Sequence, residues 1–193
     1  PVALQPKYDI VQDKEYPQFD YCYCETCRRK FQEQTGIDPL KIEDPANHPE
    51  WNQFRYDSIT RLVNEVVVPI AQKFGKKTSA AVFPNWRDVR QEWRNWNLDY
   101  FFPMLYHKFY HGNIDWVGEQ VKNGVSYLSK RQHLYSGLFV NFFSSEKLKQ
   151  AIGASLRNGA SGASFFTGFS LDSDHLKTIS ETMDQNIIDI HRK

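Results

Sequence analysis

The chain has 193 residues, of which 40% are hydrophobic and 15% aromatic, enough to bury a core and to exclude wholesale disorder. Its formal net charge is only +1, so it lacks the basic excess that is typical of nucleic-acid-binding proteins. A run of about 18 apolar residues, which a membrane-spanning helix requires, does not occur. These features predict a globular domain that binds neither nucleic acid nor the membrane interior.

We expect one domain over residues 1–193, because two domains in a chain of this length would be small. The first 75 residues are expected to hold loops, a cysteine cluster and helices. A short helix is predicted over 25–35, ended by Gly36, and a longer one over 51–74, kinked at Pro69. The chain starts at Pro1 without a methionine or a signal peptide, and we expect it to be part of a longer protein.

Residues 76–193 have a regular pattern of four strand–helix units. Short apolar runs predict strands, and apolar residues spaced by three or four predict helices. Pro103 requires a bulge or a strand end. The strands are expected over 77–83, 98–105, 134–140 and 163–166, and the helices over 87–96, over 114–128, between Ser144 and Gly159, and from Asp172 onward.

This alternation predicts an α/β fold with a parallel sheet covered by helices. The unit spacing is that of a TIM (β/α)₈ barrel, but a full barrel needs about 250 residues, so we expect its C-terminal half. A small doubly wound open sheet is the alternative. No glycine-rich phosphate turn follows any predicted strand, which favours the barrel.

Half a barrel has two open sheet edges. With sequential strand order these edges lie at 77–83 and 163–166. We expect a partner to cover them, either the N-terminal half of the same barrel or a second copy of the chain.

The three cysteines, Cys22, Cys24 and Cys27, form one C-x-C-x-x-C cluster. A disulfide framework needs an even number of spread cysteines, so this pattern favours a soft metal such as zinc in a structural site. The fourth ligand is open: His48 and a cysteine preceding Pro1 are both candidates. Three free thiols, or one oxidised pair and a third thiol, remain the alternatives.

The carboxyl ends of the strands are where parallel α/β folds place their chemistry. Those ends are rich in aromatic, amide and imidazole side chains, which stack on sugar rings and bond to hydroxyls. The candidate substrate-binding residues are Asn85, Trp86, Asp88, Tyr106, His107 and Asn141.

Glycoside hydrolysis needs two carboxylates, and the strand ends offer few. Asp99 lies at the start of its strand, at the opposite end, so we expect it to be structural. No catalytic residue can be assigned. The motifs of serine hydrolases, zincins and P-loop proteins do not occur.

Several segments resemble the glycosyl-hydrolase-like family 10 proteins, an exported barrel group often described as lipoproteins. The similar segments are Trp51-x-x-Phe54-Arg55, Ala80-Ala81-Val82-Phe83-Pro84, Gln91-Glu92-Trp93-x-x-Trp96 and Leu98-Asp99-Tyr100-x-x-Pro103-Met104-x-Tyr106. The resemblance implies that the four strands are barrel strands five to eight, that a catalytic Asp lies upstream of Pro1, and that the protein is extracytoplasmic. The cysteine cluster, followed by Phe31, is similar to the zinc-binding segment of family-42 β-galactosidases, whose fourth cysteine comes from earlier in the chain.

Together these observations predict a glycoside hydrolase acting on a polysaccharide or glycan, with this chain inactive alone. The alternatives are a non-catalytic carbohydrate-binding or assembly module on a barrel scaffold, and an independent small α/β protein with a zinc-stabilised N-terminal lobe.

Overall fold

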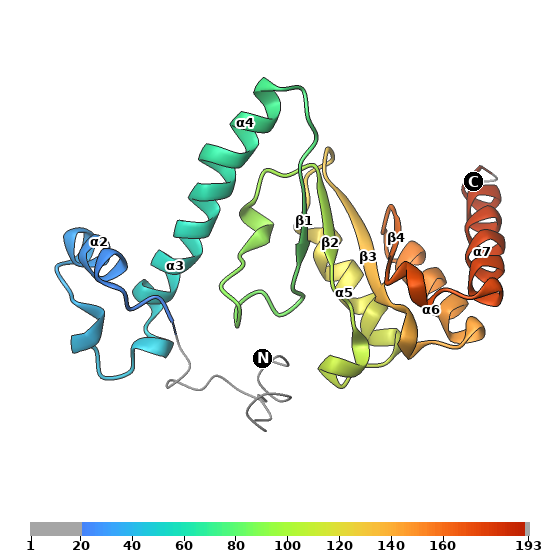
Figure 1. The fold of residues 1–193 in the computed structure, drawn as a ribbon, viewed down its shortest axis with the longest axis horizontal. Coiled ribbons are helices and arrows are strands. Elements are labelled where there is room, and N and C mark those ends of the chain that lie inside the picture. Colours follow the sequence, from blue (N-terminus) through green and yellow to red (C-terminus); the bar gives the residue numbers. More distant parts are fainter. Residues whose placement is uncertain (1–20, 192–193) are drawn as a thin grey trace. The chain divides into compact units, whose positions relative to one another are not determined.

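The structure of the chain, a computed structural model, describes residues 21–191, with side chains up to Asp184 (Figure 1). These residues form two compact units. The first consists of residues 21–67 and 85–96, and the second of residues 68–84 and 97–191. No helix in the described range is long and apolar enough to cross a membrane.

An aromatic core organises the first unit. Phe31 of helix α2 (Glu25–Thr35) is buried against Trp51 and Phe54 of helix α3 (Pro49–Arg61), with ring centroids 5.0 to 5.5 Å apart. Two 3-10 turns, Pro39–Lys41 and Pro45–Asn47, connect the helices. Helix α2 ends as predicted: Gly36 has φ 79°, and its N–H donates to the carbonyl of Gln32.

The long helix is interrupted where the sequence predicted a kink. A π-helical segment, Leu62–Val67, separates α3 from α4 (Val68–Lys73). Pro69 has no N–H to donate and its ring crowds the carbonyl of Glu65, so the preceding turn widens.

The helix predicted over 87–96 is wrong. This stretch forms turns and one 3-10 helix, Trp93–Asn95, and Arg90 has a left-handed φ of 56° that no α-helix accommodates. The carbonyls of Arg87 and Asn95 instead accept hydrogen bonds from Tyr56 and Asn64 of the first unit. Tertiary bonds thus replace the helical ones, although the spacing of the tryptophans imitates a helix.

The second unit is a four-stranded parallel sheet in the order β1-β2-β3-β4. This arrangement confirms the predicted α/β class and the alternation of strands and helices expected for the C-terminal half of a (β/α)₈ barrel. The strands are β1 (Ser79–Val82), β2 (Tyr100–Pro103), β3 (His133–Phe139) and β4 (Gly162–Phe166), and the helices are α5 (Ile114–Ser126), α6 (Ser145–Arg157) and α7 (Ser173–His191).

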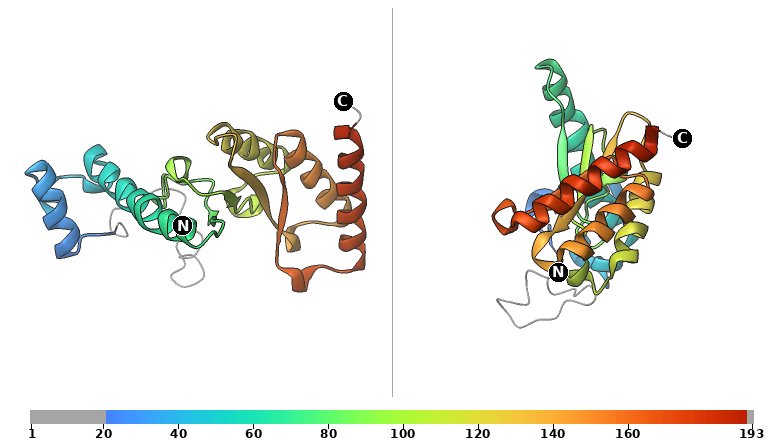
Figure 2. Two further views of the ribbon diagram at one scale, coloured as in Figure 1. Left: turned by 90° about the horizontal axis from the view of Figure 1, so that it is seen from above. Right: turned by 90° about the vertical axis from the view of Figure 1, so that its right-hand side faces the viewer.

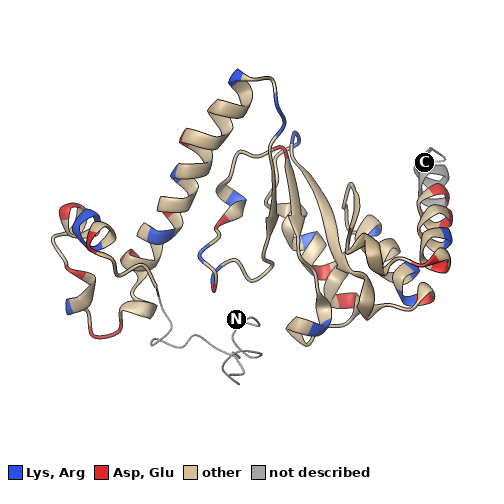
Figure 3. Ribbon diagram, viewed as in Figure 1, with Lys and Arg blue, Asp and Glu red and all other residues tan. Residues whose placement is uncertain are grey.

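One face of the sheet is closed by helices. Helix α5 packs on β3, α6 packs on β4, and α7 packs beside α6 (Figure 2). The buried side chains alternate along the strands, as Phe101, Leu134 and Leu138 do, which places them toward α5 and α6. None of the four strands contains a charged residue, so the sheet is uniformly uncharged in Figure 3.

The alternate positions form a second, aromatic face. Tyr100, Phe102 and Tyr135 are half-buried, and the rings of Phe102 and Tyr135 stack with centroids 5.4 Å apart. In the same register Tyr135 pairs with Gly162, and Phe139 with Phe166. This aromatic face of the sheet is partly open to solvent in the described residues.

The strands approach closely where β2 ends. Pro103 is the last residue of β2, as its missing N–H requires, and Gly137 of β3 lies beside it. A Cβ atom on Gly137 would lie 2.7 Å from the Pro103 carbonyl oxygen, so only glycine fits.

Asp99 ties together the amino-terminal ends of β1 and β2. Its carboxylate accepts from the Thr78 N–H and hydroxyl, at 2.8 and 3.0 Å, and from the Lys77 ammonium at 2.8 Å. These bonds, that from Lys77 foremost, lower the pKa of Asp99 to about 2. The structural role expected for this residue agrees with these contacts.

We therefore predict that Asp99→Asn destabilises the protein by about 1–2 kcal/mol at pH 7. The folded-state pKa lies below the ordinary value of 3.8, so the carboxylate stabilises the fold above about pH 4 and loses this effect as the pH falls toward 2. Urea unfolding of both proteins across this range measures the difference. The exposed Asp184→Asn serves as the matched control, and a constant difference from pH 7 to pH 2 would contradict the assignment.

Candidate functional site

Short 3-10 helices follow three neighbouring strands at their carboxyl ends. They span His107–Tyr110 after β2, Val140–Phe142 after β3 and Gly168–Ser170 after β4. Because the strands are parallel, these turns share one end of the sheet, where ligands of α/β folds bind.

Five aromatic side chains from these strands and turns form one contiguous cluster, which we call the aromatic platform: Tyr106, Phe109, Phe139, Phe142 and Phe166. The ring of Tyr106 lies 5.3 Å from that of Phe139 and stacks on Phe166 at 6.0 Å. Phe142 lies 4.6 Å from Phe139 and 4.9 Å from Phe109. All five rings therefore belong to one connected apolar surface.

Much of the platform is open to solvent. Phe166 is 54% exposed and Phe109 is 41% exposed, while the neighbouring Phe169 is fully exposed. Tyr106 is half-buried, and burial raises the pKa of its hydroxyl, which stays protonated and able to donate a hydrogen bond. A cluster of exposed rings at a strand end is a candidate binding surface.

Sequence reasoning identified only part of the platform. It named Tyr106 among the candidate residues, but it did not name Phe109, Phe139 or Phe166. The last two are the final residues of their strands and are paired in register. The sequence could have identified Phe139, because the period-2 alternation of a strand places it on the same face as Tyr135, opposite the helices.

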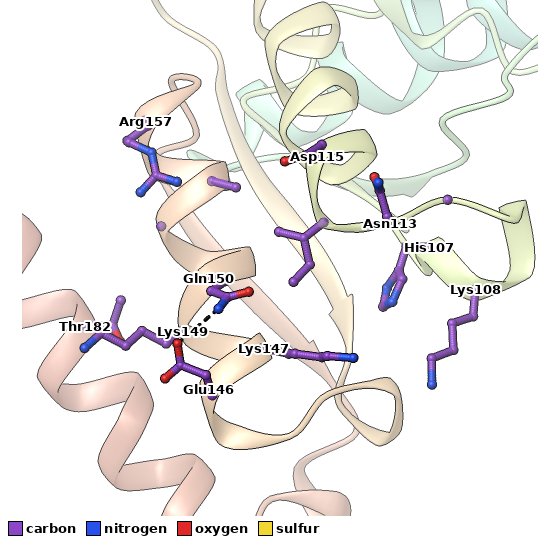
Figure 4. Close-up of a pocket in the computed structure, with 14 residues that line it drawn as sticks. His107, Lys108, Asn113, Asp115, Glu146, Lys147, Lys149, Gln150, Arg157 and Thr182 are labelled. Atoms are coloured by element: carbon purple, nitrogen blue, oxygen red, sulfur yellow. Dashed lines mark hydrogen bonds between the residues drawn. The ribbon is translucent and has the colours of Figure 1, made fainter.

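His107 follows Tyr106 but lies in a different environment. It is buried, its ring packs on Phe143 with centroids 4.7 Å apart, and it lines a cavity of about 890 Å³ beside α5 and α6 (Figure 4). Burial, followed by the charges of Lys108 and Lys147, lowers the pKa of His107. Neutral imidazole is thus favoured, and its Nδ1 has no hydrogen-bond partner.

None of the other four predicted residues is one of the platform rings or lines the cavity of His107. Asn141 is exposed in the turn after β3. Asn85, Trp86 and Asp88 belong to the first unit, where the Asn85 amide donates to Asp88 at 2.9 Å. Trp86 is buried, and two guanidinium groups, those of Arg87 and Arg94, lie over its ring.

The turns that form the platform carry no acidic side chain. Residues 104–113, 140–145 and 167–171 contain neither Asp nor Glu. The next carboxylate, Asp172, accepts from the His175 N–H at 2.8 Å and so holds the first turn of α7. These segments supply no acid and base for hydrolysis.

The cysteine cluster lies at the start of α2. The sulfurs of Cys22 and Cys27 are 2.9 Å apart and pack against the aromatic core of the first unit. Burial raises the pKa of Cys27 to about 12, whereas the N–H and thiol of Cys27 lower the pKa of Cys24.

The spacing of the cysteine sulfurs differs from that in a zinc site. Two thiolates on one tetrahedral zinc would lie about 3.8 Å apart, which is wider than the observed spacing. His48 accepts from the Trp51 N–H as the cap of α3. Among the side chains that the structure describes, no group of three or more from His, Cys, Asp or Glu is arranged to hold a metal ion. The sulfurs of Cys22 and Cys27 lie close together, but they would have to move apart to bind one zinc ion.

Zinc binding stays a prediction with a direct measurement. We expect about one zinc per chain in protein purified without chelators, measured by elemental mass spectrometry, and loss of that zinc in Cys24→Ser, because thiolates are its preferred ligands. His48→Gln is the companion variant and retains the zinc if the fourth ligand is another residue. Metal-free protein in which all three thiols react with a thiol reagent would refute zinc binding.

Comparisons with known proteins give this chain no relative: a scan of protein-family models and searches of curated proteins and of solved structures each found no match.

Proposed function

We propose that this chain is the glycan-binding half of a glycoside hydrolase barrel. The observation that carries the proposal is the aromatic platform, an exposed set of connected rings at the carboxyl ends of parallel strands. Sugar rings have apolar C–H faces that stack on aromatic side chains. The proposal agrees with the resemblance of the sequence to the glycosyl-hydrolase-like family 10 proteins.

Polar groups beside the platform would orient a sugar. The Tyr106 hydroxyl and the exposed Asn141 amide both lie in segments that follow the strands, and both can bond to sugar hydroxyls.

In this proposal the catalytic carboxylates come from a further segment that completes the barrel. A parallel sheet is normally covered on both faces. Here β1 and β4 are the outer strands of the described sheet, and its aromatic face is half-open. An N-terminal half-barrel would cover this face and could bring the acid pair to the platform. An extracytoplasmic location belongs to the same proposal and rests on the resemblance.

A non-catalytic carbohydrate-binding module is the second candidate. It is favoured by the same lack of acidic residues in the platform turns, because a binding module needs rings and amides but no acid pair. The two candidates share the platform and differ in whether a completed barrel hydrolyses its glycan.

The first experiment measures binding of the full chain to a panel of polysaccharides by affinity electrophoresis and calorimetry. We expect binding to at least one glycan and a loss of about tenfold in Phe166→Ala, which removes the most exposed ring of the platform. Phe74→Ala is the matched control, since Phe74 is also exposed but lies after α4. No binding to any glycan, or equal losses in both variants, would refute the platform.

Reducing-sugar release then separates the two candidates. A longer chain that includes four preceding strand–helix units should hydrolyse the bound glycan if the protein is a glycoside hydrolase. Binding without any release of sugar by that longer chain would instead identify a binding module.

A further inference from the structure

The cavity beside His107 has a distinct chemistry. It lies on the helix side of the sheet, between the start of α5 and the length of α6 (Figure 4). Its volume of about 890 Å³ is in the range of small-molecule sites. Its lining includes none of the five rings of the aromatic platform.

Basic side chains outnumber acidic ones around this cavity. The acidic lining residues are Asp115 and Glu146, and Glu146 already accepts from the Gln150 amide at 3.0 Å. The basic lining residues are Lys108, Lys147, Lys149 and Arg157. The excess of two positive charges attracts an anion.

The imidazole of His107, a buried polar ring, lines the same cavity. His107 is only 7% exposed, and its Nδ1 is buried without a hydrogen bond. In Figure 4 its ring points toward the end of Lys147. An unpaired buried polar atom costs about 1–3 kcal/mol, so a ligand that bonds to it would be favoured.

The N-terminus of helix α5, which carries a partial positive charge, lies at the same cavity. Helix α5 has 13 residues, and its first residues, with the cap Asn113, line the cavity. Asn113 accepts from the Trp116 N–H, which leaves the N–H groups of Ile114 and Asp115 without intrahelical acceptors. The N-terminus of a helix of this length favours the binding of an oxyanion.

We propose that this cavity binds a tetrahedral oxyanion, phosphate or sulfate, through Lys147, Lys108 and the imidazole of His107. The anion neutralises two ammonium groups and supplies the missing partner of the buried ring. The site goes beyond the proposed glycan-binding function and does not depend on it. The same oxyanion can be a free ion or a substituent on a sugar.

Calorimetry of the full chain with inorganic phosphate and with sulfate, at constant ionic strength, tests the site, and the imidazole resonances of His107 report on the binding position. We expect saturable binding that shifts these resonances. Lys147→Gln should weaken binding at least tenfold, whereas Lys122→Gln, which removes an exposed lysine of α5 outside the cavity, should change it less than twofold. No saturable heat, no shift of His107, or equal effects of the two variants would overturn the proposal.

A second arm distinguishes the source of the oxyanion. Equal affinities for inorganic phosphate and glucose 6-phosphate, both lost in Lys147→Gln, would identify a site that recognises the phosphate group alone and binds the free ion. Tighter binding of the sugar phosphate, with glucose alone not competing, would identify a substituent on a sugar. Sugar phosphate binding that survives Lys147→Gln would contradict the cavity as the site. Loss of glycan binding in Phe166→Ala without loss of phosphate binding keeps the two proposals separate.

Discussion

The need to cover both faces of a parallel sheet governs this structure. The four strands carry no charge, and their buried side chains alternate with aromatic ones. Helices α5 and α6 cover the side of Phe101 and Leu138, while the side of Phe102 and Tyr135 stays half-open. The register that creates these two faces is held at one end by Asp99 and at the other by the close approach of Gly137 to Pro103.

The same register places two different surfaces at one end of the sheet. Tyr106 stacks with rings from β3 and β4, whereas His107, the next residue, is buried beside α6 among basic side chains. The first surface fits an uncharged ring, and the second fits an oxyanion.

The strands were predictable because each is a short apolar run bounded by turn residues, and the helix of 25–35 because Gly36 ends it. The prediction of a helix over 87–96 was wrong, because Arg90 has a left-handed backbone conformation. The Arg87 carbonyl accepts a hydrogen bond from the distant Tyr56 hydroxyl instead of one from its own helix. Tyr106 and His107 were found from their place after a strand. Phe166 was missed because a residue inside an apolar strand looks like core until the open face is known, and Lys147 because an exposed helix lysine has no signature in the sequence.

We propose that a partner covers the open edges and the aromatic face of this sheet, and light scattering of the purified full chain over a wide concentration range tests this most directly. We predict a mass above the monomer value of 22.7 kDa that rises with concentration, because the open edges and the aromatic face associate. A monodisperse species of 22.7 kDa at every concentration would contradict it.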